Sequence, residues 1–266
     1  MASNRIGPFD GSYCMSQNDS RMAFALREIY STFGDKTRVN RKSLRKFGAN
    51  FSVGTSQTPV NSWGEYEDYQ TSNVTLNLSS SSALDTATVT IEYMYFVGSD
   101  LTFAIQTKQL QGQTPVALDS AGCRWMRMYT DSNVTGDIWL YRGAATAGVP
   151  DTISNTHNQI TAGFNQSQKA ATSIAATNYL ILTYGWMDIV RSASAAGAGF
   201  LKVRQLGSDF RVAPTRGISA SNSVNYYFDP YAIIPPNSDI EIDAQATSGS
   251  SNDVTAGFDG YFADIY

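Results

Sequence analysis

The chain has 266 residues and a net charge of −4, and only 16% of its side chains are charged, from 19 basic and 23 acidic residues. This length provides a buried core for one large domain or two smaller ones. The negative balance argues against a phosphate-binding protein, because such proteins usually carry a net positive domain, so direct nucleic-acid binding is not expected. No secretory signal or membrane-spanning segment is expected, because no stretch has the required apolar length. Cys14 and Cys123 are expected to stay reduced, as in a cytosolic product.

Residues 1–46 are expected to form an arm with one short α-helix. Over about 20–33 apolar residues recur every three or four positions, which predicts a helix of roughly 20 Å. Asp19 or Ser20 can cap its start, and Gly34 can end it in a left-handed turn. An isolated helix of this length is marginal in water, so its apolar stripe must be covered by its own β body or by a neighbouring subunit. The residues of the stripe that we expect to contact a partner are Leu26, Ile29 and Phe33.

A basic strip follows at 36–46, with six positive side chains and no acidic one. The rest of the chain then carries 13 basic against 23 acidic residues, a net charge of −10. Such a run can be a solvated loop, or it can bind an acidic partner surface, and we favour the second interpretation. If extended, the strip spans roughly 35 Å, enough to cross from one subunit to the next. Its predicted partner-binding residues are Lys36, Arg38, Arg41, Lys42, Arg45 and Lys46.

After residue 46 the hydrophobic period changes to two, which predicts β-strands. A first β unit is expected over 47–143 and a second over 157–266, with a linker or loop at 144–156. Short strands separated by Gly, Ser, Asn and Pro, without alternating helices, favour a mainly β fold: an antiparallel β-sandwich, jelly-roll-like, in one or two tandem units. The predicted strands are 73–79, 86–98, 101–106, 123–130, 137–143, 179–190, 200–206, 210–214, 223–229, 238–246 and 257–265, with a hairpin turn at 98–100.

Few residues could carry catalysis or bind a metal. The single histidine, His157, lies in the polar segment SNTHNQ and is interpreted as a loop residue. No GxSxG elbow accompanies it, so it is not expected to belong to a Ser-His-Asp triad. One histidine and two cysteines argue against a zinc site, and the spacing of the C-terminal aspartates does not match a calcium-binding loop. We therefore expect no enzymatic activity, no cofactor and no metal.

Aromatic and acidic residues gather in the segment WGEYEDY. The preferred interpretation is a loop packed by its own aromatic side chains. As an alternative, Trp63, Tyr66 and Tyr69 could form the sugar-binding surface of a carbohydrate-binding adsorption module. The neighbouring carboxylates, Glu65 and Asp68, could also support glycoside hydrolysis, which needs a carboxylate pair.

Four stretches of the chain are distinctive: RKFGANFSVGTSQTPVNSWGEYEDY (45–69), SSSALDTATVTIEYMYFVG (80–98), DIWLYRGAATAGVPDT (137–152) and IIPPNSDIEIDAQATSGSSNDVTAGFDGYFAD (233–264). They resemble a group of virion structural proteins of tailed double-stranded-DNA bacteriophages. The resemblance covers about 45–266 and leaves out the opening 44 residues. None of the stretches is a catalytic motif, so no active-site residue carries over.

The resemblance implies a non-enzymatic virion structural protein, made in the host cytoplasm. A capsid decoration or cement protein on the head surface, bound to the major capsid protein, is the first choice, because a basic arm can lie along an acidic capsid exterior while the acidic body faces water. A tail or neck component is the alternative. Low charge and abundant tyrosine suit subunit contacts, so we expect a homo-oligomer. The resemblance favours a trimer, because cement proteins often sit on threefold sites.

Overall fold

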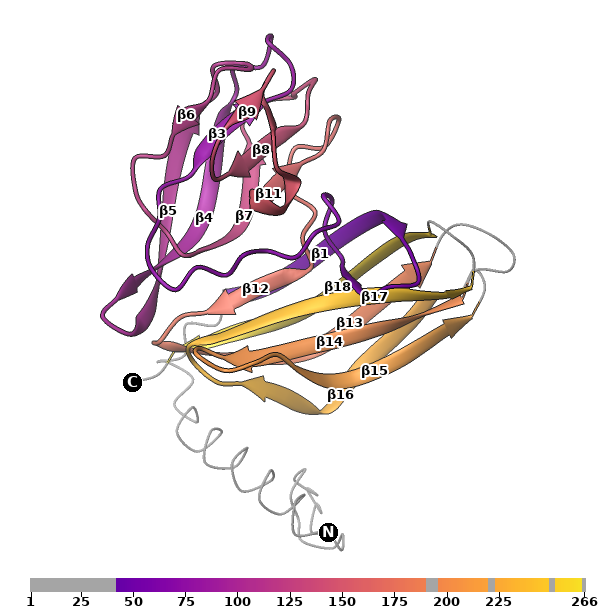
Figure 1. Cartoon of the computed structure of the whole chain (residues 1–266). Helices are drawn as coiled ribbons and strands as arrows, with labels where there is room; N and C mark the ends of the chain where they lie inside the picture. Colours follow the sequence, from indigo (N-terminus) through magenta and orange to yellow (C-terminus); the bar gives the residue numbers. More distant parts are fainter. Residues whose placement is uncertain (1–41, 190–195, 220–222, 249–251, 265–266) are drawn as a thin grey trace, which may run out of the picture. The chain divides into compact units, whose positions relative to one another are not determined.

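The structure, a computed structural model, describes residues 42–189, 196–219, 223–248 and 252–264 (Figure 1). The predicted helix at 20–33 and the arm up to Arg41 lie outside the described residues. Every strand pairing within the described part is antiparallel, which confirms the predicted mainly β fold. The one helix described there is a 3-10 turn, η1 (Ile153–Asn155), so no described helix is long and apolar enough to cross a membrane.

Two sheets form a first sandwich. Its strands are β3 (Asn77–Ser80), β4 (Thr88–Val97), β5 (Asp100–Gln109), β6 (Val116–Ala117), β7 (Arg124–Thr130), β8 (Ile138–Tyr141) and β11 (Thr156–Ile160). One sheet has the order β5-β4-β7 and the other β11-β8-β3-β6. Alternate apolar residues of both sheets, such as Ile91, Trp125 and Leu140, meet in one buried cluster, as expected for strands with one face turned to a core.

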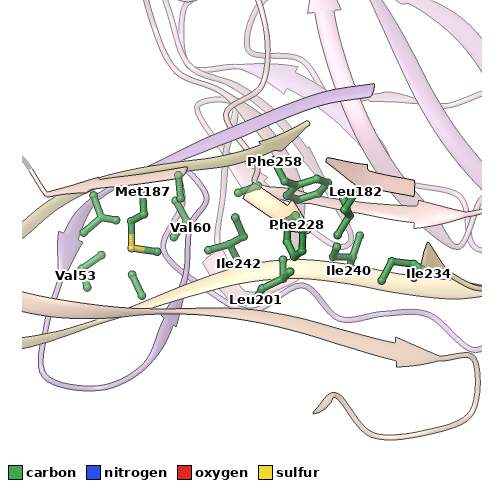
Figure 2. Packing of buried hydrophobic residues seen from close by; sticks show 14 of the residues in the cluster. Val53, Val60, Leu182, Met187, Leu201, Phe228, Ile234, Ile240, Ile242 and Phe258 are labelled. Atoms are coloured by element: carbon green, nitrogen blue, oxygen red, sulfur yellow. The ribbon is translucent and has the colours of Figure 1, made fainter. Parts of the chain in front are cut away.

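Two longer sheets form a second sandwich. Its strands are β1 (Lys42–Val53), β2 (Thr58–Pro59), β12 (Ala171–Ile174), β13 (Asn178–Ile189), β14 (Ala196–Gln205), β15 (Arg211–Ser219), β16 (Ser223–Ile234), β17 (Ser238–Ser248) and β18 (Asn252–Asp264). Sheet A has the order β1-β18-β13-β16, and sheet B has the order β12-β17-β14-β15, with β2 paired to β17. Figure 2 shows Leu182 and Phe258 of sheet A packed with Ile240 and Ile242 of sheet B.

The order of the strands places early and late segments of the chain in the same sheets. β1 pairs with β18, so the end of the predicted basic strip is the beginning of a strand in sheet A. The predicted linker at 144–156 contains a two-stranded pair, β9 (Ala145–Thr146) and β10 (Val149–Pro150), followed by η1. The strands on either side of this segment, β8 and β11, pair with each other, so the sheets do not divide there.

The predicted hairpin between 86–98 and 101–106 is present as β4 and β5. Val97 pairs with Asp100, which leaves a two-residue turn at Gly98 and Ser99. Gly98 has a φ of 64°, a left-handed conformation that glycine adopts without the steric conflict of a side chain.

Candidate functional site

Buried acidic side chains line the outer face of sheet B. In β17 the apolar residues Ile240 and Ile242 point into the core, so the alternate residues Asp239, Glu241 and Asp243 point to the opposite face. All three carboxylates are nevertheless buried. Buried carboxylates require compensating charges or hydrogen bonds, and the neighbouring strand and a covering loop supply both.

Basic residues of β14 and β7 neutralise these carboxylates. The register places Arg204 beside Asp239 and Lys202 beside Glu241. Arg204 Nε lies 2.9 Å from Asp239 Oδ2, and Lys202 Nζ lies 3.0 Å from Glu241 Oε1 and 2.8 Å from Asp243 Oδ2. Arg124 of the first sandwich adds two bonds to Asp239, at 2.9 and 3.2 Å. This ion-pair network therefore joins the two sandwiches.

The segment WGEYEDY covers this network. The hydroxyl of Tyr66 donates to Asp243 Oδ2 at 2.7 Å, and that of Tyr69 donates to Glu241 Oε2 at 2.9 Å. Burial, followed by the nearby carboxylates, raises the pKa of both tyrosines. The guanidinium of Arg204 lies over the Tyr69 ring at 4.2 Å, and Trp63 is buried. Of the three residues of the sugar-binding alternative only Tyr66 is exposed, so this geometry supports the packed-loop interpretation.

A second buried cluster surrounds Glu67. The Lys169 ammonium bonds to Glu67 Oε2 and donates to the carbonyl oxygens of Trp125, at 2.9 Å, and His157, at 3.4 Å. Burial by itself raises the pKa of Glu67, but Lys169 and then His157 outweigh it and lower the pKa to about 2.

His157 belongs to this cluster rather than to a loop. It lies in β11 with 1% of its surface exposed, and its ring is 4.6 Å from that of Trp125. Its Nδ1 is 3.8 Å from Glu67 Oε1. The predicted loop position was therefore wrong. The polar run around His157 forms a fully buried strand, in which Asn158 Nδ2 donates to the Trp125 carbonyl at 3.2 Å.

The end of the basic strip divides between the interior and the surface. Lys46 is buried, and its ammonium donates to the Met126 carbonyl. Burial, followed by repulsion from Lys169, lowers its pKa to about 7. Because this ammonium is bound inside the chain, Lys46 cannot reach a partner surface. Lys42 is exposed, and the Arg45 side chain is 82% exposed. The other predicted partner-binding residues, Leu26, Ile29, Phe33, Lys36, Arg38 and Arg41, lie outside the described residues.

The outer face of sheet A carries an aromatic surface that includes Arg45. The strand registers align Arg45, Asp259, Tyr184 and Tyr227 in one row across the four strands, with Trp186 in the next row. We call these five residues the sheet-A face. Tyr227 is 74% exposed, and its ring centre is 5.0 Å from that of Tyr184.

Local contacts orient Tyr184, Arg45 and Trp186 on the sheet-A face. The Tyr184 hydroxyl lies 2.5 Å from Asn225 Oδ1, and Arg45 Nε lies 3.4 Å from Asp259 Oδ1. A side-chain carbon at Gly257 would lie 2.9 Å from two atoms of the Trp186 ring, so glycine allows the indole to lie against the sheet. Sequence reasoning missed this surface because aromatic residues occupy both faces of β16, where Tyr226 and Phe228 point inward.

Chemistry-bearing groups elsewhere are sparse in the part of the chain that the structure describes. No group of three or more His, Cys, Asp or Glu residues there could hold a metal ion. Cys123 is fully buried, and burial, which outweighs the effect of Arg124, raises the pKa of its thiol to about 12.

Comparison with known proteins finds only remote similarity to solved structures. No protein-family model matches the chain, and no curated protein matches it. Among solved structures, a chain in the structure of the infectious bursal disease virus Gx strain is similar to this chain, with 10% sequence identity and a TM-score of 0.21. The match covers 86% of this chain and 72% of the viral chain. The infectious bursal disease virus VP2 subviral particle is similar with 11% identity and a TM-score of 0.19, over the same shares. TM-scores this low do not indicate a shared fold.

Proposed function

We propose that this chain is a non-enzymatic structural protein of a virus particle. More narrowly, we propose a capsid decoration or cement protein of a tailed bacteriophage that binds the major capsid protein on the head surface and acts as a homo-oligomer, with a trimer favoured. The four stretches that resemble phage virion proteins support the placement in a particle. The sheet-A face is the observation that carries the attachment.

The composition of the sheet-A face suits a protein partner. Tyrosine, tryptophan and arginine supply most of the binding energy at the centres of protein interfaces. Here Trp186 rests against the sheet at Gly257, and Tyr184 is hydrogen-bonded to Asn225. Side chains held in place before binding lose little conformational entropy when a partner covers them, so this face is prepared for contact.

The sheet-A face is continuous with the basic strip. Lys42 and Arg45 end the exposed part of the strip, and Arg45 is itself part of the face. By contrast, the acidic residues Asp239 and Asp243 of the body are neutralised internally. Arg45 is paired with Asp259 within the face, so the proposed contact with an acidic partner surface rests on Lys42 and the preceding basic residues of the strip, as expected for a capsid exterior bound by a basic arm.

Occupancy on purified particles tests this proposal. To test the arm, the shortened chain should start at Lys42, because this removes the arm and keeps β1. A chain starting at residue 47 would also lose part of a strand of sheet A. We expect Trp186→Ala and Tyr227→Ala to fold and to bind particles at reduced occupancy. Phe164→Ala, which alters an exposed aromatic residue of a loop, is the matched control. Wild-type occupancy of both face variants would refute attachment through this face.

Charge reversal tests the basic part of the contact. Substituting Arg41, Lys42 and Arg45 by Glu should lower occupancy, and the loss should be larger at low salt, where charges are least screened. Equal loss at low and high salt would contradict an electrostatic contact.

Copy number separates the head from the tail. Quantitative mass spectrometry should find on the order of hundreds of copies per particle for a cement protein, against about six to twelve, or a small multiple, for a neck or tail ring. A ring-like number would replace the cement assignment by the tail or neck alternative.

A further inference from the structure

The strand β5 forms one edge of the sheet β5-β4-β7 (Figure 1). It pairs with β4 along its whole length without a register shift. At Leu101 the main chain points away from β4, because its N–H donates to Asn237 Oδ1 and its carbonyl accepts from the Ala176 N–H, both at 2.9 Å. Main-chain groups alternate in direction along a strand, so those of Phe103, Ile105 and Thr107 point the same way.

These outward groups are unpaired within the described part of the chain. No hydrogen bond to the main-chain N–H or carbonyl of Phe103, Ile105 or Thr107 is present on that side among the described residues. We call these three residues the free edge. Asn237 and Ala176 block the strand at Leu101, so a pairing strand must begin at about Phe103.

The free edge has none of the usual protection against pairing. Edge strands of natural proteins commonly carry lysine, proline or a bulge that prevents another strand from adding. Here Phe103 is 44% exposed and Ile105 is 54% exposed on the same face, with the uncharged Thr107 beside them. The charged residue Lys108 points to the other face, where its ammonium lies 2.5 Å from Asp119 Oδ1.

Contacts on that other face hold the strand in place. The side chain of Gln106 donates to the Ser120 carbonyl at 3.3 Å and accepts from the Ser120 N–H at 3.2 Å. The edge is therefore a fixed, uncharged row of donors and acceptors with an apolar face.

We propose that the free edge pairs antiparallel with the free edge of a second copy of this chain, around a two-fold axis. Two identical edges can approach because neither carries a charge on the exposed face, and antiparallel pairing satisfies the same donors and acceptors in both copies. The block at Leu101 favours a register in which Ile105 faces Thr107 of the second copy and Phe103 faces Gln109 of the second copy. The two Ile105 side chains are then diagonal neighbours, a distance over which long side chains still interact.

This pairing is independent of the attachment proposed above and of any threefold association. If the chain also forms a trimer through another surface, pairing through β5 joins two trimers. The molecular mass in solution then corresponds to an even number of chains, and disrupting the free edge halves this mass. The structure thus assigns β5 a contact that can be tested on the isolated protein.

The test compares Ile105→Lys with Leu84→Lys, which introduces the same charge at a strongly exposed turn residue. Light scattering after size exclusion, between about 1 and 100 µM, measures the mass. We expect an even number of chains for the wild type and for Leu84→Lys, and half that mass for Ile105→Lys. A wild-type mass of one chain or another odd number would overturn the proposal, as would a mass that Ile105→Lys leaves unchanged or that both variants reduce.

Hydrogen exchange across Asp100–Gln109 provides the second measurement. The N–H groups of Thr102, Ala104 and Gln106 face β4 and should stay protected in both variants, which shows that the sheet is folded. The N–H groups of Phe103, Ile105 and Thr107 should be protected in the wild type and should exchange rapidly in Ile105→Lys. Rapid exchange of these three groups in the wild type at high concentration would overturn the pairing.

Discussion

Replacing Glu67 by Gln should destabilise the protein strongly at neutral pH. The substitution keeps the shape of the side chain but removes the negative charge beside the buried ammonium of Lys169. The pKa of Glu67 falls from 4.5 to about 2 on folding. This lowering of the pKa corresponds to roughly 3 kcal/mol of folding free energy at pH 7, because a tenfold change in an equilibrium constant is about 1.4 kcal/mol. Breaking a buried ion pair by removing one partner typically costs about 3–5 kcal/mol, which agrees in size.

The stabilisation by Glu67 should also depend on pH in a defined direction. The folded-state pKa of Glu67 is depressed, so its stabilisation is fully present above the unfolded pKa of 4.5 and is lost as the pH falls towards 2. The difference in unfolding free energy between the wild type and Glu67→Gln should therefore shrink over this interval.

Urea unfolding of the isolated protein at pH 7, and at a series of pH values below 5, measures both effects. Glu65→Gln is the matched control, because Glu65 is exposed in the same segment. Adding Lys169→Met to Glu67→Gln should recover part of the lost stability, since it removes the unpaired buried charge. A loss below about 1 kcal/mol at pH 7, or strictly additive effects of the two substitutions, would refute the reasoning.

Three further predictions concern buried groups. Lys46→Met should stabilise the protein by about 1–3 kcal/mol at pH 6 in urea unfolding, because burial disfavours the charged lysine. The pKa of Lys46 is about 7 in the folded protein and 10.5 in the unfolded chain. The unfolding free energy of the wild type should therefore rise as the pH increases from 7 to 10.5, and that of the variant should lack this rise. His157→Ala should lower the unfolding free energy by about 2–4 kcal/mol, because it leaves a cavity against Trp125; a neutral effect would contradict this packing. In a Cys14→Ser variant, Cys123 should react with a thiol reagent only after denaturant is added, and prompt reaction in the folded protein would show that the thiol is accessible.

The strands that sequence patterns predicted best are those with one apolar face. β4 and β5 lie within a few residues of the predicted ranges, because their alternation is regular and Gly98 marks the turn. β1 was not predicted, because its inward positions include Lys46, Gly48 and Asn50 instead of apolar residues. A strand whose buried face is polar has no hydrophobic period to detect.

The ion pairs could not be predicted for a different reason. Arg124 and Asp239 are 115 residues apart, and Glu67 and Lys169 are 102 residues apart. Which charges meet depends on the sheet order, which local patterns do not specify. The acidic alternation of β17 was visible in SDIEIDAQA, but it indicates a solvated strand face unless the covering loop is known.

The pairing of β1 with β18 has a consequence for how the protein is made. These are the first and last of the described strands, and their register runs from Lys42 opposite Phe262 to Val53 opposite Asn252. During synthesis β1 leaves the ribosome some 200 residues before its partner strand, β18. Arg124 leaves 115 residues before Asp239, with which it forms an ion pair. Sheet A therefore closes only after translation has passed β18, and we expect slow folding because contacts this distant must form together. A nascent chain that has not yet passed β18 cannot complete the sheet-A face, so a partner meets this face only after β18 has been made.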